Sequence, residues 1–571
     1  MTEWSSQLVL IIVPLLPLLL VLGLTIPALR HPLERLAPLA AIPGLLLALT
    51  PQAGAPVTIS WLFLGAHLGL DATGRTFLLL TALLWLAAGL YAHSYCRKYP
   101  NYRRFWIFFL ATMSGNLGLT LSLDMVSFYV FFTLMSFAAY GLIVHEGTSF
   151  TLRAGKIYLW LVIIGEVLLF AALVLAARIA DSLLMKDVAA VLADTSAQPL
   201  IIGLLMIALG IKMGIVPLHF WLPLAHPAAP VPASAVLSGA MIKAGLLGLL
   251  RLLPLGHVAL PGWSMALISL GLLMAFLGVA AGLFQTQSKT LLAYSSISQM
   301  GFPLLGIGLG LAHPATWPLV AGAISFYALH HGLAKGALFL GVGMIPNLKG
   351  TPVLRLATLA GVLIPALALA GAPWTSGALA KSGLKEYLFQ SPLAEVQTLV
   401  VLLGLAATGT TLLMCRLVFL LFKESEQSTS ASAMGMWTGW LLLIIVVTMG
   451  GIRPVWLTGI RPEQIPKLVD AAWPLLLAAL IATAVWYKRP PFSRNWNVPA
   501  GDMIVIIEGM AKRLADAVAM RPRPALPQLP RQPRWQNLPM LLLLWDAEKL
   551  LRQLTVAGVM FILLLLVLLL L

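Results

Sequence analysis

The chain has 571 residues, of which 60% are apolar and only 10% are charged, and its mean hydropathy is +0.95. A soluble domain averages about 25% charged residues, so this composition excludes a protein whose main solvent is water. The net charge of +16 would indicate nucleic-acid binding in a soluble protein, but here most basic residues lie between apolar runs, where they act as topology signals. We therefore expect an all-α integral membrane protein that lies in the lipid bilayer and does not bind nucleic acid.

Apolar runs along the chain predict about 14 to 16 transmembrane helices of roughly 20 residues each. The first run lacks a basic start and a small-residue cleavage site, so we expect a retained helix and not a signal peptide. The predicted spans lie near residues 8–29, 36–50, 75–95, 105–122, 125–145, 157–178, 199–217, 233–253, 262–284, 291–311, 316–345, 354–379, 397–422, 436–452, 471–487 and 551–571.

Basic residues cluster in alternate loops, as after the first, third and fifth spans. Cytoplasmic loops carry the excess of lysine and arginine, so this pattern predicts a non-cytoplasmic N-terminus. We expect a multi-pass protein of a bacterial inner membrane.

Two apolar helices are interrupted by glycine and proline beside a lysine. The interruptions are Gly210–Pro217, which contains Lys212, and Gly371–Lys381. Unwound backbone inside a membrane is tolerated where it lines a cavity, and paired broken helices are typical of inverted-repeat transporters. Because glycine and proline are also common in ordinary membrane helices, the lysines are what favour the functional interpretation.

Four domains are predicted. Residues 1–103 form N-terminal helices, 104–253 a first five-helix repeat, and 262–423 a second. Residues 424–571 hold C-terminal helices, a proline- and arginine-rich surface segment at 488–535, and a final transmembrane helix.

Several titratable side chains fall inside apolar runs. An intramembrane lysine costs roughly 2.5–3.5 kcal/mol on insertion scales, so each is a functional hypothesis. The alternative for a single lysine is that it extends to the interface, but four in different helices predict a proton wire with histidines as relays. These residues are Lys212, Lys243, Lys335 and Lys381, with His330 and His331 about one turn before Lys335.

Three stretches resemble the signature of the antiporter-like subunits of respiratory complex I, membrane-bound hydrogenases and multisubunit sodium/proton antiporters. The first is KMGIVPLHFWLPLAHPAAPVPASAVLSGAMIKAG, Lys212–Gly245, which also contains His219 and His226. The others are LAYSSISQMG, Leu292–Gly301, and HGLAKGALF, His331–Phe339. The resemblance covers about residues 70–425.

The resemblance implies two inverted five-helix bundles with broken helices around a central polar axis. It assigns Lys212 as a switching proton site and Lys381 as an exit or terminal site. Lys243, His331 and Lys335 are the implied relay between them. His330, His219 and His226 complete the candidate proton pathway.

One departure from the family concerns a glutamate of the fifth helix, whose carboxylate pairs with the first lysine. The matching stretch here is FFTLMS, which places Thr133 at that position. Along the same helix, Asp124 lies about 13 Å from Thr133 and Glu146 about 20 Å from it. Glu166 lies roughly 15 Å into the hydrocarbon core, where an acid needs a partner. We predict that Glu166 approaches Lys212.

The sequence favours a proton-translocating subunit of a larger complex over a non-conducting structural or anchoring subunit. Cys96 and Cys415 lie outside any metal-binding or redox spacing, so neither metal nor cofactor is predicted. The energy source is therefore expected on a partner: a redox arm, other antiporter subunits, or an inorganic-carbon uptake protein. Sodium needs several oxygen ligands, whereas this axis offers mostly nitrogen, so protons are favoured over sodium. Catalysis by the chain alone is not predicted.

Overall fold

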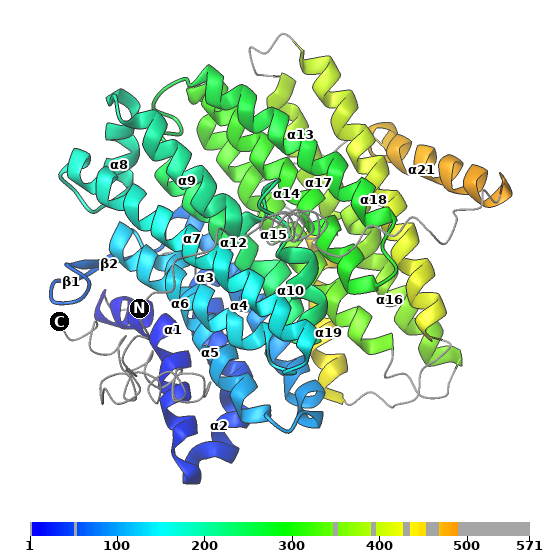
Figure 1. Cartoon of the computed structure of the whole chain (residues 1–571), viewed down its shortest axis with the longest axis horizontal. Helices are drawn as coiled ribbons and strands as arrows, with labels where there is room; N and C mark the ends of the chain where they lie inside the picture. Colours follow the sequence, from blue (N-terminus) through cyan, green and yellow to red (C-terminus); the bar gives the residue numbers. More distant parts are fainter. Residues whose placement is uncertain are drawn as a thin grey trace, which may run out of the picture. The chain divides into compact units, whose positions relative to one another are not determined.

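The computed structural model describes residues 3–50, 54–345, 352–389, 395–425, 434–452 and 468–488 (Figure 1). These residues are predominantly helical, and eleven helical stretches among them are long and apolar enough to cross a membrane. This confirms the predicted all-α membrane fold. The predicted final span at 551–571 and the surface segment beyond Lys488 lie outside the described residues, and the four-domain division stays a prediction.

The described elements follow the predicted runs closely. In the first half of the chain they are α1 (Glu3–Thr25), α2 (Arg30–Leu36), α3 (Ile42–Leu49), β1 (Val57–Ile59), β2 (Ala66–Leu68), α4 (Ala72–Tyr95), α5 (Tyr102–Leu121), α6 (Met125–Ile143), α7 (Ser149–Ala180), α8 (Met185–Val191), α9 (Gln198–Met213), α10 (Leu222–Ala228), α11 (Val231–Val236) and α12 (Ile242–Leu252). Short 3₁₀ turns connect several of them, and β1 and β2 form a two-stranded sheet.

The second half continues with longer helices. They are α13 (Pro261–Leu283), α14 (Ser288–Ala312), α15 (Trp317–Met344), α16 (Pro352–Ala370), α17 (Ser376–Phe389), α18 (Val396–Ser425), α19 (Met434–Ile452) and α21 (Leu468–Lys488).

Both predicted interruptions are real breaks in helices. Helix α9 ends at Gly214, whose φ of 73° is left-handed, and the Ile215 N–H closes the end by donating to the Gly210 carbonyl at 2.9 Å. The second break corrects one expectation, because residues 354–379 are not a single span. Gly371 adopts φ 85° after α16 and Pro373 has no N–H to donate, so the chain restarts as α17.

A third irregularity lies in the run predicted as one helix at 233–253. Its middle, Leu237–Met241, is a π-helical turn between α11 and α12. Such a turn rearranges the main-chain hydrogen bonds and is frequent at functional sites. It lies directly before Lys243.

Small residues let the helices approach closely, which is the usual basis of packing between membrane helices. A Cβ at Gly301 of α14 would lie 2.2 Å from the Gly271 carbonyl oxygen of α13, so only glycine fits there. Helices α13 and α14 run side by side (Figure 1). A Cβ at Gly115 of α5 would likewise lie 2.5 Å from the Met135 nitrogen of α6.

One buried arginine connects the ends of three helices. Arg251, in the last turn of α12, donates to the carbonyls of Leu119, Thr120 and Ser122 at 2.7–3.1 Å, where α5 ends. It also pairs with Asp71 at 2.9 Å, the residue that caps α4. The guanidinium thus supplies donors to helix-end carbonyls that have no partner inside their own helix.

Candidate functional site

The first broken helix holds Lys212 among hydroxyl groups. Its Nζ donates to Ser136 Oγ at 3.0 Å and to the Tyr158 hydroxyl at 3.2 Å. Tyr158 in turn donates to the Ser136 carbonyl at 2.8 Å. Lys212 is 3% exposed, so its ammonium depends on these groups from α6 and α7.

Glu166 lies on α7 beside the same stretch of α6. The Thr133 hydroxyl donates to Glu166 Oε2 at 2.6 Å, and the carboxylate is buried. The charges of Glu166 and Lys212 interact, yet their hydrogen bonds involve different residues of α6: Glu166 accepts from Thr133, and Lys212 donates to Ser136. Since Thr133 and Ser136 are three residues apart, they lie on one face of α6, with the acid bonded to the first hydroxyl and the lysine to the second.

The other two acids that the sequence offered have different partners. Asp124 caps α6 by accepting from the Ser127 N–H at 2.7 Å, and it also accepts from the His67 N–H at 2.7 Å. Glu146 follows the end of α6 and accepts from the Tyr99 hydroxyl at 2.8 Å.

Lys243 and Lys335 are buried in the centre of the described helices. Lys243 Nζ donates to the Ser238 carbonyl in the π-helical turn at 2.6 Å. Lys335 Nζ donates to the Leu292 carbonyl of α14 at 2.9 Å. With exposures of 1% and 0%, neither lysine extends to the surface of the chain, so the interfacial alternative does not hold for them.

The four predicted histidines are also buried. His330 Nδ1 shares a 2.9 Å hydrogen bond with Ser376 at the start of α17. Neither ring nitrogen of His331 or of His226 has a protein partner among the described residues. His226 packs edge-on against Phe339, and His219 is 0% exposed in the first break.

Lys381 closes the second break. Its Nζ donates to the Leu369 and Ala370 carbonyls at 2.8 and 3.0 Å, which are the last carbonyls of α16. A cation here complements the negative end of that helix. The ammonium also lies 5.7 Å from the Phe302 ring centroid.

Electrostatic contacts divide the predicted residues into two groups. Lys212 interacts with Glu166. A second group comprises His331 and the three lysines whose charges act on it, Lys243, Lys335 and Lys381. The two groups meet where α9 packs on α12, since a Cβ at Gly245 would lie 3.2 Å from Lys212 Cβ.

Sequence reasoning missed three side chains that contact the predicted residues. Ser136 was detectable, because it follows Thr133 by one helical turn. Tyr158 and Ser376 carried no such signal, since hydroxyl residues are common in membrane helices and both reach their partners through tertiary packing.

Comparison with known proteins agrees with this architecture. Residues 122–411 match the family model described as "NADH:quinone oxidoreductase/Mrp antiporter, TM". Hydrogenase-4 component B of Escherichia coli (strain K12) is 29% identical over 396 residues, which are 65% of this chain and 59% of that protein. A component of the Na(+)/H(+) antiporter of Bacillus subtilis (strain 168) is 27% identical over 69% of this chain and 82% of the relative.

Some relatives are much longer than the matched region. The alignment with putative antiporter subunit mnhA2 of Staphylococcus saprophyticus covers 57% of this chain but only 44% of that protein, at 30% identity.

Two solved structures share the fold. A chain of the membrane-bound sulfane sulfur reductase, an archaeal respiratory membrane complex, superposes with a TM-score of 0.66 at 21% identity, covering 95% of this chain and 100% of the other. A chain of the Mrp complex from Dietzia sp. DQ12-45-1b gives 0.64 at 19% identity, covering 85% of this chain and 100% of the other. The resemblance carried by the three sequence stretches is therefore confirmed, and the chain belongs to the NADH:quinone oxidoreductase/Mrp antiporter transmembrane family.

Proposed function

We propose that this chain is a proton-translocating, antiporter-like subunit of a larger membrane complex, and that protons move along its Lys/His/Glu axis. The observation that carries the proposal is the burial of four lysines in four different helical segments, with exposures of 0–8%. Idle charges at such positions would only cost stability, so their retention favours a role in conduction.

Glu166 and Lys212 form the switching pair in this proposal. The carboxylate is positioned by Thr133 and the ammonium by Ser136 and Tyr158, so either group can change its protonation without losing its hydrogen-bond partner. Protonation of one group changes the electrostatic energy of the other. A proton that binds Lys212 therefore changes how strongly Glu166 binds its own proton.

Lys243, His331 and Lys335 form the relay, and Lys381 is the terminal site. A neutral imidazole offers one donor and one acceptor, and both nitrogens of His331 lack a protein partner in the described part of the chain. Histidine is suited to passing protons because its ordinary pKa lies near 6.5.

Protons remain the favoured ion over sodium. The ammonium groups of Lys243, Lys335 and Lys381 occupy main-chain carbonyl oxygens that a sodium ion would need.

The energy source in this proposal belongs to a partner protein. Relatives bear the names of hydrogenase and sodium/proton antiporter components, so a redox arm or other antiporter subunits are the partners most directly suggested. An inorganic-carbon uptake protein is a third candidate. We place the complex in a bacterial inner membrane with the N-terminus of this chain on the non-cytoplasmic side.

A structural or anchoring subunit is the second candidate function. The specific observation in its favour is Thr133, which stands where the family carries a carboxylate. The contact of Thr133 with Glu166 weakens this alternative, because it brings an acid from the neighbouring helix to the same place.

Proton flux separates the two functions. We expect the full-length chain, purified with the partners that accompany it and reconstituted into liposomes, to conduct protons, and Lys212→Ala to abolish the flux. Lys186→Ala, an exposed lysine of α8, is the matched control and should conduct like the wild type. Equal flux in all three proteins would overturn the proposal.

A further inference from the structure

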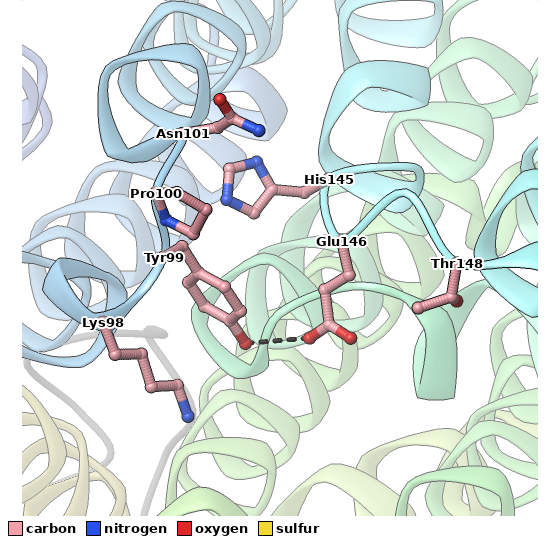
Figure 2. Close-up of a pocket in the computed structure, with 7 residues that line it drawn as sticks. All are labelled: Lys98, Tyr99, Pro100, Asn101, His145, Glu146 and Thr148. Atoms are coloured by element: carbon pink, nitrogen blue, oxygen red, sulfur yellow. Dashed lines mark hydrogen bonds between the residues drawn. The ribbon is translucent and has the colours of Figure 1, made fainter.

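A surface pocket of about 450 Å³ lies between the loop that joins α4 to α5 and the loop that joins α6 to α7. Figure 2 shows the Tyr99 hydroxyl directed at Glu146, with the His145 ring close to Pro100 and Asn101. Lys98 and Thr148 complete the lining. The pocket lies beside the basic residues Arg97 and Lys98 of the first loop and Arg103 and Arg104 at the start of α5, on the side that the positive-inside rule predicts to be cytoplasmic.

Glu146 is the acid of this pocket. Its side chain is exposed to solvent, while its Oε1 accepts the 2.8 Å hydrogen bond from Tyr99. One carboxylate oxygen is thus held in place and the group remains accessible to water. An anchored, exposed carboxylate can exchange protons with solvent.

Lys289 connects this acid to the interior. It is the second residue of α14, and the charges of Glu146 and Lys98 both act on it. Its Nζ donates to the Ala229 carbonyl at 2.6 Å, where α10 ends. Lys289 therefore contacts the end of the helix that carries His226 and interacts electrostatically with the acid of the pocket.

His226 is the next titratable group inward. It lies three residues before Ala229, and the charges of Lys289, Lys335 and Lys243 all act on its ring. Both of its ring nitrogens lack a protein partner in the described part of the chain. The ring is fully buried against Phe339.

We propose that this pocket is the proton intake of the chain, with Glu146 as the collecting acid and Lys289 and His226 as the two steps that connect it to Lys335 and Lys243. This inference rests on the proposed function and names the entry to the same axis. In each step an O–H or N–H bond of the donor breaks, an N–H bond of the acceptor forms, and no electrons are transferred. The donor then regains a proton from the side of the pocket.

The test uses the full-length chain with its accompanying partners in liposomes. Glu146→Gln keeps the size and the hydrogen bond from Tyr99 but removes the titratable group. We expect proton flux to fall about tenfold or more, since positioned proton donors contribute about 10² to 10⁴ in rate. Glu395→Gln, the same change at an exposed glutamate before α18, is the matched control and should leave the flux unchanged.

Lys289→Met gives a second, independent reading, because it keeps the length of the apolar stem and removes the amine. If Glu146 and Lys289 act in one path, the proton flux of the double variant is no lower than that of the single variant with the lower flux. Additive losses, or a Glu146→Gln variant that conducts like the wild type, would overturn the intake assignment.

These outcomes differ from a failure of the proposed function. Without conduction by the wild type, or with flux unaffected by Lys212→Ala, the axis itself is wrong. When wild-type flux depends on Lys212 but not on Glu146, only the intake is wrong. Size-exclusion profiles that match the wild type exclude misfolding as the cause of any loss.

Discussion

Thr133 of α6 donates a 2.6 Å hydrogen bond to Glu166 of α7, and Thr133 stands where the sequence resemblance implies a carboxylate. Three residues later on α6, Ser136 accepts from Lys212. Glu166 of α7 and Lys212 of α9 therefore both form hydrogen bonds with the same face of α6. We interpret this arrangement as a carboxylate relocated from α6 to α7.

The hydroxyl of Thr133 should matter to conduction. Thr133→Val keeps the shape of the side chain but removes the donor to Glu166. A hydrogen bond to a charged group is worth about 1.5–3 kcal/mol, so we expect proton flux in liposomes to fall about tenfold or more. Thr133→Ser retains the hydroxyl and should conduct within about threefold of the wild type. Flux through Thr133→Val equal to that of the wild type would show that the bond is not needed.

The relocation itself can be reversed. Thr133→Glu combined with Glu166→Thr returns the carboxylate to α6 and conserves the combined volume of the two side chains, which limits the cost of repacking. We expect Glu166→Gln alone to abolish flux and the exchanged pair to restore a measurable part of it. An exchanged pair that assembles normally but conducts no better than Glu166→Gln would contradict a carboxylate role at this place.

Much of the fold was predictable because the signals are local. Apolar runs placed the described spanning helices, and glycine beside lysine marked the breaks at Gly214 and Gly371. Glu166, an acid inside an apolar run, is buried in α7, while its depth in the bilayer stays a prediction. The apolar content of residues 354–379 also predicted a single span there, which is wrong because the break at Gly371 divides the run into α16 and α17.

The contacts of the charged groups could not be read in the same way. Lys335 donates to the Leu292 carbonyl, and a main-chain acceptor leaves no trace in residue type. The pairing of Tyr99 with Glu146 joins two loops 47 residues apart, which only tertiary packing brings together. Local pattern therefore predicts which groups are buried, and packing decides which partner each one meets.

Arg251 should be a major source of stability. Arg251→Met would leave three helix-end carbonyls without the Arg251 donor, and leaving a buried acceptor unsatisfied costs about 1–3 kcal/mol. Asp71, whose side chain is 42% exposed, can be solvated by water instead. We expect a clearly lower unfolding midpoint in detergent. Arg251→Lys should recover only part of it, because one ammonium cannot reproduce the forked geometry.

The control for this prediction is Arg178→Met, at an exposed position near the end of α7. Surface changes of this kind are usually within about 0.5 kcal/mol. If Arg251→Met and Arg178→Met lower the midpoint equally, the network around Arg251 contributes no special stability.

His145 should make the stability of the pocket loops sensitive to acid. Burial, assisted by the nearby Arg104 guanidinium, lowers the pKa of His145 from 6.5 to about 4. The ring also packs edge-on against Tyr99 and Phe105. Because the folded state disfavours the charged ring, the unfolded state binds a proton more readily between these two values, and the stability is lost as the pH falls from 6.5 toward 4.

His145→Phe keeps an aromatic ring in this place and removes the titration. The difference in unfolding midpoint between wild type and His145→Phe should therefore be constant above pH 6.5 and shift in favour of the variant between pH 6.5 and 4. A single group can change the unfolding equilibrium by at most about tenfold per pH unit, so a steeper divergence would point to further groups. Parallel midpoints across the whole range would show that His145 is not held neutral by its surroundings, and the acid sensitivity of this face would then need another origin.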